Sequence, residues 1–266
     1  MNRSPLARRL IPVLAVLLFL FLYAPLAVLG AFSFQKSPIL SWPIDEWSLR
    51  WYAALLQNSQ LIDAIKNSLI VALSCVAVTS VGGVGLALIL HRFQPSVALL
   101  MERTILLTLI VPQLITGLAF LLIFNRTGMQ LSLLTVIIGQ SAVWMPLMVT
   151  QVRVRLRALP PELRQAAMDL GATPFQAFWY ITLPSIATTV TGSALLVFIL
   201  SFDELPVTFF LTGAQNTLPM YIWSMLRTGI TPEINAVATL TIGVSILLVA
   251  LGLHLLVKSS NRKEEQ

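Results

Sequence analysis

Residues 160–184 of this chain read Pro-Pro-Glu-Leu-Arg-Gln-Ala-Ala-Met-Asp-Leu-Gly-Ala-Thr-Pro-Phe-Gln-Ala-Phe-Trp-Tyr-Ile-Thr-Leu-Pro, a polar segment between long apolar runs. Proline suits the first turn of a helix and glycine suits the left-handed residue that ends one, so we expect a first helix between Pro160 and Gly171. One face of this helix is apolar, and its two alanines let a partner approach the backbone closely; the face comprises Leu163, Ala166, Ala167 and Leu170. The segment is therefore predicted to dock another protein.

A second helix is predicted directly after the glycine. Thr173 is a suitable cap, Pro174 takes the first helical position, and Gln176 stands three residues after the cap. We expect this helix to end at Leu183-Pro184, because proline interrupts a helix. Its bulky face carries Phe175, Phe178 and Trp179. The whole segment is predicted to form a helix, a sharp turn and a second helix.

The composition is that of an integral membrane protein. Hydrophobic residues make up 57% of the sequence and charged residues only 11%, and the mean hydropathy is +0.85. A soluble globular domain carries far more charge. Six apolar runs are each close to the roughly 20 residues that cross a hydrocarbon core as a helix; they lie near 10–34, 65–90, 104–124, 131–152, 186–212 and 236–257. We predict an all-α, polytopic protein in which residues 1–266 form a single transmembrane domain.

The positions of Lys and Arg predict the orientation, because cytoplasmic segments carry the excess of these residues. With the N-terminus inside, twelve basic residues fall on the cytoplasmic side: Arg3, Arg8, Arg9, Arg92, Arg103, Arg153, Arg155, Arg157, Arg164, Lys258, Arg262 and Lys263. Five fall outside: Lys36, Arg50, Lys66, Arg126 and Arg227. Both termini and the cytoplasmic segment 153–185 are therefore expected inside the cell.

The first apolar run begins at Arg8-Arg9 and extends to Phe32. A cleaved signal peptide has a similar basic start, but this run is longer than a typical signal h-region, and no convincing small-x-small cleavage site follows it. We therefore expect an uncleaved first span.

Motifs for catalysis, metal binding or nucleotide binding do not stand out. The glycine-rich stretch at 82–85 lacks the lysine of a phosphate-binding loop, and the close packing of helices explains its glycines. His91 and His254 have no acidic partner at metal-ligand spacing, and the single cysteine, Cys75, cannot form an internal disulfide. The basic residues flank the spans, so contact with anionic lipid explains them better than nucleic-acid binding. We expect neither an enzyme nor a metal site.

Two adjacent acids, Asp203 and Glu204, lie in the fifth apolar run. Each costs roughly 2.5 kcal/mol or more to insert, and such residues normally face a bundle interior or an aqueous cavity. Because neighbouring helical positions point about 100° apart, we expect one of the two to line a substrate path. Pro206 is expected to kink or open the helix beside them. The alternatives are a structural ion pair, for instance with Arg227 or a partner chain, and a shorter span that leaves the acids at its outer interface.

Two tryptophans are further candidates for the substrate path. Trp144 and Trp223 offer aromatic faces that attract alkylammonium groups. Packing and interface marking are the ordinary roles of membrane tryptophans. The outer segment 213–235 contains a stretch with helical apolar spacing, Thr217–Leu226, which is predicted to form a re-entrant or interfacial helix. It would serve as a gate, as a docking floor for a binding protein, or as a packing surface for a partner permease.

The cytoplasmic segment resembles the signature of ABC importer permeases, which is Glu-Ala-Ala, three residues, Gly, nine residues and Ile-x-Leu-Pro. All spacings are kept here: Gln165-Ala166-Ala167, then Gly171, then Ile181-Thr182-Leu183-Pro184. The resemblance implies a coupling segment at 153–185 that sits in a groove of a separate ATPase subunit. Gln165 replaces the usual acid, and Glu162 or Asp169 would have to supply any ion pair there.

The C-terminal half looks like that of spermidine/putrescine importer permeases of the second-subunit type. The strings that carry this resemblance are Ser201-Phe202-Asp203-Glu204, Thr217-Leu218-Pro219-Met220 and Thr231–Thr239. It implies a type I ABC importer permease fold in a bacterial inner membrane and a heterodimer with a second permease. It further implies two ATPase subunits, which hold the ATP and magnesium, and a periplasmic binding protein. Related permeases move aminoethylphosphonate, opines or iron, so the cargo stays open within the family.

Two other classes of protein fit parts of the sequence. In a secondary transporter, the acids would form a proton or cation relay, but inverted repeats are expected there and no convincing repeat relates the two halves. In a membrane scaffold, the cytoplasmic segment would bind a partner and the acids would be dispensable.

Overall fold

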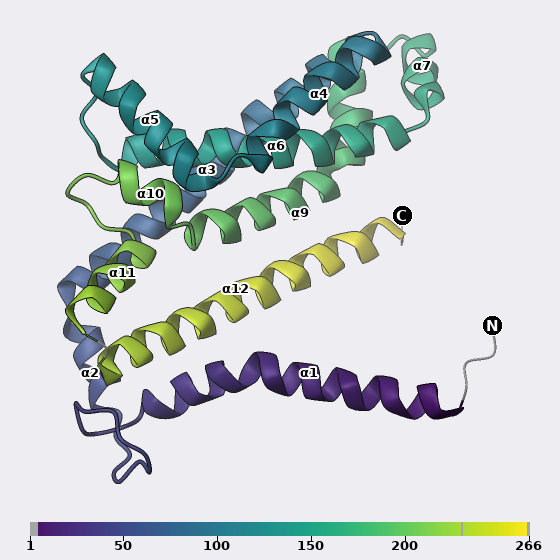
Figure 1. Ribbon diagram of the computed structural model, residues 1–266. Coiled ribbons are helices and arrows are strands. Elements are labelled where there is room, and N and C mark those ends of the chain that lie inside the picture. The colour runs from purple at the N-terminus through teal and green to yellow at the C-terminus, as the bar shows by residue number, and fades with distance from the viewer. Residues whose placement is uncertain (1–4, 230, 265–266) are drawn as a thin grey trace. The chain divides into compact units, whose positions relative to one another are not determined.

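The computed structural model describes residues 5–229 and 231–264, which are almost entirely helical (Figure 1). The helices are α1 (Pro5–Phe32), α2 (Arg50–Gln57), α3 (Ser59–Arg92), α4 (Pro95–Ile110), α5 (Gln113–Thr127), α6 (Leu133–Ala158), α7 (Pro161–Asp169), α8 (Pro174–Ala177), the π-helix η1 (Phe178–Thr182), α9 (Leu183–Phe202), α10 (Pro206–Leu211), α11 (Leu218–Thr228) and α12 (Pro232–Glu264). The only β-structure in the described residues is one isolated bridge. The all-α prediction is confirmed.

The chain divides into two compact units. One comprises residues 1–61 and 222–246, and the other comprises residues 62–221 and 247–266. In the first unit, the loop after α1 is closed by the bridge between Gln35 and Trp47. Trp51 at the start of α2 donates its indole N–H to the Gln35 carbonyl at 2.7 Å. The loop is therefore an ordered element with its own hydrogen bonds.

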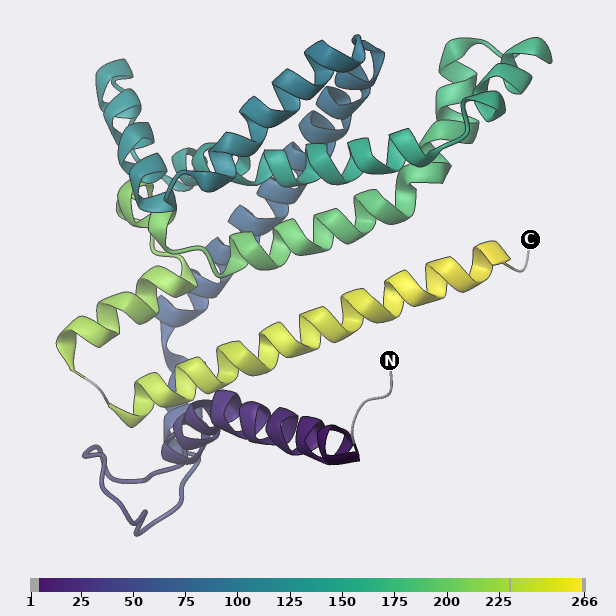
Figure 2. The same cartoon turned by 45° about the vertical axis from the view of Figure 1, so that its right-hand side comes forward.

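The second unit is organised around α6. In the most apolar 18 residues of α6, 56% of the residues are buried. The corresponding share is 28% for α3 and 17% for the helical stretch Pro174–Phe202. α6 lies along α9 in both views of Figures 1 and 2. Two hydrophobic clusters line it; the first includes Val71, Cys75, Phe124, Val143, Trp144 and Val207, and the second includes Leu90, Met148, Val152, Leu156 and Ile186. α6 is thus the core helix of this unit.

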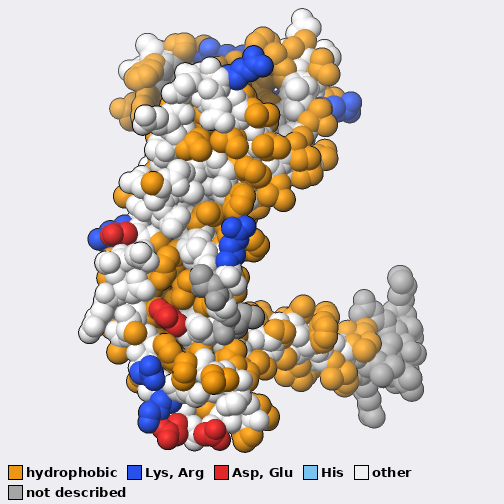
Figure 3. Space-filling view, turned by 60° about the vertical axis from the view of Figure 1, so that its left-hand side comes forward, with side chains coloured by type: hydrophobic (Ala, Val, Ile, Leu, Met, Phe, Trp, Pro, Cys, Tyr) orange, Lys and Arg blue, Asp and Glu red, His pale blue; other side chains and the backbone are white. Residues whose placement is uncertain are grey.

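Several helices are long and apolar enough to cross a membrane. Four such stretches are Ile11–Phe32, Ser59–Arg92, Leu133–Ala158 and Pro174–Phe202. A fifth span is possible in the pair Ser96–Ile110 and Gln113–Thr127, and Pro232–Leu247 is a shorter apolar stretch. Hydrophobic side chains are spread over much of the face in Figure 3, as expected for lipid contact. The membrane character is confirmed, while the count of six spans and the orientation stay predictions.

The third apolar run is interrupted at a proline. α4 and α5 meet at an angle of 98°, and the break falls at Val111 and Pro112. Val111 has extended backbone angles, because proline excludes the helical conformation from the residue before it, and Pro112 itself is extended as well. Pro112 therefore interrupts this apolar run.

A buried cluster of charges ties α4 to α6. Arg153 and Glu102 are almost fully buried, and the guanidinium of Arg153 donates to the Glu102 carboxylate at 2.7 Å and to the Ala98 carbonyl at 2.7 Å. Arg157 donates to the same carboxylate oxygen at 2.9 Å. One carboxylate of α4 thus pairs with two guanidinium groups of α6 and balances one of their two positive charges. Sequence reasoning did not find this cluster, because the partners are about fifty positions apart.

Glu102→Gln is expected to destabilise the protein strongly, because it leaves the buried Arg153 charge without its counter-charge. The expected cost is about 3–5 kcal/mol, seen as a lower midpoint of thermal unfolding in detergent. Glu46→Gln is the matched control, since the Lys36–Glu46 pair is more than half exposed and its loss should cost under about 1 kcal/mol. Equal midpoints for the two variants would contradict the structural role of Glu102.

Candidate functional site

Residues 160–184, which are predicted to be cytoplasmic, form the predicted helix, turn and helix. α7 begins at Pro161, and Gly171 follows it with φ +89°, a left-handed conformation that glycine adopts without steric cost. Thr173 and Gln176 then cap α8 reciprocally: the Gln176 amide N–H donates to Thr173 Oγ1 at 3.3 Å, and the Thr173 amide N–H donates to Gln176 Oε1 at 2.8 Å. The capping box read from the sequence is confirmed.

The predicted end of the second helix at Leu183-Pro184 is wrong. The chain passes from α8 through η1 into α9 without a break, so that Pro174–Phe202 is one helical stretch. The reason is the π-turn, in which the Leu183 amide N–H bonds the Phe178 carbonyl five residues back. This wider turn precedes Pro184 and places it in the first turn of α9, where a proline is tolerated.

α7 presents its apolar face to the outside of this unit. None of its residues is fully buried, and Leu170 just beyond it is 90% exposed. Leu163, Ala166 and Ala167 contribute the remaining apolar surface. Beside them, Phe175, Phe178 and Trp179 form an aromatic cluster with ring centroids 5.7 and 6.0 Å apart. We call α7 and this aromatic cluster the docking surface.

The polar residues of the predicted coupling site also lie on this surface. Glu162, Gln165 and Asp169 are all exposed on α7, so either acid is accessible to a basic partner. Ile181 and Leu183 are half-buried, and Pro184 is exposed, on the helical stretch that follows. The structure brings the motif residues into one helical hairpin. Their contact with a partner stays a prediction.

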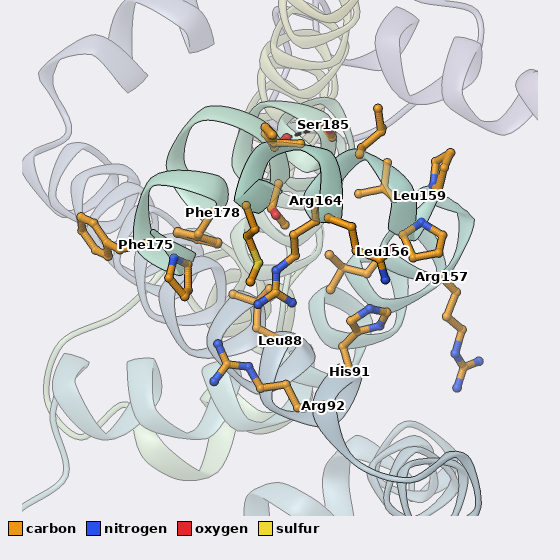
Figure 4. Close-up of a pocket in the computed structure, with 18 residues that line it drawn as sticks. Leu88, His91, Arg92, Leu156, Arg157, Leu159, Arg164, Phe175, Phe178 and Ser185 are labelled. Carbon is orange, nitrogen blue, oxygen red and sulfur yellow. Dashed lines mark hydrogen bonds between the residues drawn. The ribbon is translucent and has the colours of Figure 1, made fainter. Parts of the chain in front are cut away.

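Behind the docking surface lies a cavity of about 940 Å³ (Figure 4). Its walls come from the ends of α3 and α6, from α7 and α8, and from the start of α9. Arg164 of α7 reaches toward the end of α3, where His91 and Arg92 lie. We call this feature the basic cavity.

The fifth apolar run is interrupted at the acids. α9 ends at Phe202 and α10 begins at Pro206, so Asp203, Glu204 and Leu205 connect two helices. The expected opening beside Pro206 is therefore confirmed. The two acids differ in their environments: Asp203 is exposed on this unit, whereas Glu204 is only 4% exposed.

The carboxylate of Glu204 caps α10. It accepts the amide N–H of Val207 at 2.6 Å and that of Thr208 at 3.0 Å. It also accepts the Thr208 hydroxyl at 2.6 Å and the Gln140 amide at 3.2 Å. Ser201 donates to the carbonyl oxygen of Gln140 and completes the group. Glu204 is thus occupied by hydrogen bonds within this unit.

Asp203 has no comparable partners. Within the part of this unit that the structure describes, neither acid forms an ion pair with Lys or Arg. The backbone N–H of Asp203 bonds the Ile199 carbonyl at 3.3 Å and ends α9, while its side chain is exposed. The sequence could not separate the two acids, and the structure separates them by burial and hydrogen bonding.

The two tryptophans lie in different units. Trp144 is buried in the first hydrophobic cluster, and its indole N–H has no hydrogen-bond partner among the residues that the structure describes. Trp223, on α11, is 40% exposed, and the guanidinium of Arg227 lies 5.9 Å from the centre of its ring. The predicted helix in the outer segment is confirmed as α11. A role for either tryptophan in the substrate path stays a prediction.

Comparison with known proteins identifies the family. Residues 80–265 match the model of the binding-protein-dependent transport system inner membrane component family. The putrescine transport system permease protein PotI of Escherichia coli strain K12 is 33% identical over 277 residues, which cover 99% of this chain and 96% of that protein. The spermidine/putrescine transport system permease protein PotC of Haemophilus influenzae is 30% identical and covers 91% of this chain and 94% of its own length.

Solved structures show the same fold. A chain of a bacterial ABC transporter that imports the acidic polysaccharide alginate aligns with a TM-score of 0.76 at 18% identity, covering 95% of both chains. The methionine ABC transporter MetNI aligns with a TM-score of 0.63 at 17% identity, covering 75% of this chain and 95% of that chain. Since the family model matches more than half of the sequence and a full-length relative is 33% identical, the chain belongs to the binding-protein-dependent transport system inner membrane components, the permeases of ABC importers.

Proposed function

We propose that this chain is a permease subunit of an ATP-driven importer that moves polyamines, such as putrescine or spermidine, across the bacterial inner membrane. The observation that carries the cargo class is the similarity to a putrescine permease along 99% of the chain. An exposed carboxylate at a break in an apolar helical run supports the same cargo, because a di- or tri-cation that leaves water needs counter-charge.

The importer needs further chains. We propose a second permease subunit as the heterodimeric partner, two ATPase subunits and a periplasmic binding protein. ATP and magnesium would bind to the ATPase subunits, and this chain would not itself catalyse hydrolysis. The exposed apolar face of α7 supports an ATPase partner, since an apolar helix face beside an aromatic cluster is typical of a protein interface.

The docking surface would transmit force through its small residues. Ala166 and Ala167 leave the α7 backbone accessible to a groove in the ATPase, and the exposed Leu170 would be buried there. Gln165 replaces the usual acid of the motif, so Glu162 or Asp169 would make any ion pair with the ATPase. Motion of the ATPase would then move α7 together with the helical stretch Pro174–Phe202.

Asp203 would be the cargo contact and Glu204 would hold its geometry. A carboxylate that already accepts four hydrogen bonds loses part of them if it turns to a cation, and the amide N–H groups of α10 would then be unsatisfied. Asp203 has an exposed side chain and pays no such cost. An ammonium group of a polyamine would therefore meet Asp203 first.

Asp203→Asn is expected to lower ATP-dependent uptake of putrescine by about tenfold or more, because a charged hydrogen bond contributes about 1.5–3 kcal/mol. Asp203→Glu keeps the charge and should retain most of the uptake. The measurement is uptake of labelled putrescine into vesicles that contain the whole transporter. Uptake by Asp203→Asn at the native rate, with assembly intact, would make this acid structural.

Glu204→Gln is the comparison variant for that experiment. It is expected to lower the thermal midpoint, since the neutral amide is a weaker acceptor for the α10 N–H groups. Asp203→Asn should leave this midpoint nearly unchanged, because its expected effect on the free energy of unfolding is under about 0.5 kcal/mol. If native vesicles take up no polyamine at all, the cargo belongs to another class, whatever the variants do.

Ala167→Trp is expected to abolish association with the ATPase subunit, because a large side chain on the small face of α7 blocks close approach. Ala53→Trp is the matched control, an exposed alanine of α2 that precedes the second predicted span. Co-purification of the ATPase with each variant is the measurement. An Ala167→Trp permease that still binds its ATPase and transports normally would show that the coupling site lies elsewhere.

A further inference from the structure

The basic cavity combines two kinds of surface. His91, Arg92, Arg157 and Arg164 supply basic groups, and none of the described residues that line it is Asp or Glu. The remaining wall is largely apolar and includes Leu88, Leu156, Leu159, Met168, Phe175 and Phe178. A small inorganic anion would use only the basic part. A ligand with an anionic head and an apolar tail would use both parts.

The positive charges of the cavity are only partly balanced. Arg157 shares the Glu102 carboxylate with Arg153. In contrast, Arg92 and Arg164 form no ion pair with any acid among the residues that the structure describes. Figure 4 shows Arg164 extending from α7 toward the end of α3, where Arg92 lies. Two guanidinium groups at one cavity repel each other, and an anion bound between them offsets this repulsion.

The position of the cavity agrees with a lipid ligand. α3 and α6 are both long and apolar enough to cross the membrane, and the cavity lies at their C-terminal ends. Arg92 ends α3, and basic residues near the ends of spans normally extend to the level of the phospholipid headgroups. Basic pockets between spanning helices on the cytoplasmic side are typical sites for anionic headgroups. A volume of about 940 Å³ accommodates a headgroup and the beginning of an acyl chain.

We propose that the basic cavity binds an anionic phospholipid, with the headgroup phosphate between Arg92 and Arg164 and the acyl chain along Leu88, Met168 and Phe178. Such a lipid joins α7 to the end of α3. It holds the docking surface in place against the spans, so that movement of α7 passes into the membrane instead of being lost in bending of the hairpin. The proposal does not depend on which solute is transported.

The test uses the permease together with the subunits that co-purify with it, freed of lipid in detergent. Phosphatidylglycerol, phosphatidylcholine with the same chains and inorganic phosphate are titrated separately, and bound lipid is counted by native mass spectrometry. The variants are Arg92→Gln with Arg164→Gln, and a control, Arg103→Gln with Arg126→Gln, that removes two exposed arginines outside the cavity. A third pair, Arg92→Lys with Arg164→Lys, keeps the charges.

Phosphatidylglycerol is expected to bind in preference to phosphatidylcholine. Binding should be about thirtyfold weaker in the Arg92→Gln, Arg164→Gln variant, because each basic group contributes about 1 kcal/mol. The control should bind like the native chain, and the lysine variant within about tenfold of it. Thermal unfolding of each variant shows whether it is folded. If the glutamine variant is unfolded, the preference of the native chain for phosphatidylglycerol over phosphatidylcholine carries the test.

Four results would overturn the proposal. Equal binding of the two lipids would show that the headgroup is not recognised. Equal losses of lipid binding in the cavity variant and the control would show that binding depends on the general surface charge and not on the cavity. If inorganic phosphate displaces phosphatidylglycerol and stabilises the protein against thermal unfolding equally well, the ligand of the cavity is a free anion. Unchanged lipid binding with loss of the ATPase from the cavity variant would assign the cavity to an acidic surface of that subunit.

Discussion

The hydrogen bonds of the Glu204 carboxylate make the break in the fifth apolar run possible. A helix that stops and restarts inside a membrane exposes backbone N–H groups that no lipid can satisfy. At the start of α10, Pro206 has no N–H, Val207 and Thr208 donate to Glu204, and Phe209 donates to the Leu205 carbonyl at 2.8 Å. All four positions of this helix start are accounted for. The break is therefore a stable feature that leaves Asp203 outside the hydrogen-bonded group.

The packing of α10 depends on the same break. α10 lies so close to α5 and α6 that a Cβ atom on Gly117 or Gly139 would clash with Phe210 or Leu211. The hydroxyl of Thr135 in α6 also bonds the Leu211 carbonyl at 2.8 Å. Because α10 is held on two sides, the connection at 203–205 is held at its C-terminal end by the core. At its N-terminal end, it continues directly from α9.

One helical stretch from Pro174 to Phe202 therefore links the docking surface to Asp203, over about 43 Å at 1.5 Å per residue.

The sequence predicted those features that depend on local rules. The capping box at Thr173, the left-handed turn at Gly171 and the break at Pro206 follow from the chemistry of single residues, and the structure confirms them. The predicted helix end at Pro184 was wrong, because a π-turn accommodates the proline within a continuous helix. No local sequence signal distinguishes this arrangement from a helix end. Sequence reasoning also missed Glu102 with Arg153 and the partition between the two acids. Glu102 and Arg153 are 51 positions apart, and the bond from Gln140 to Glu204 spans 64 positions; periodicity does not report such contacts.

The most direct test of this account is a structure of the assembled transporter with putrescine trapped inside the membrane. We expect an ammonium nitrogen within about 2.7–3.2 Å of the Asp203 carboxylate, while Glu204 still accepts the amide N–H groups of Val207 and Thr208. An ammonium group bound to Glu204 with those amides released, or bound away from both acids, would contradict the division of roles between the two carboxylates.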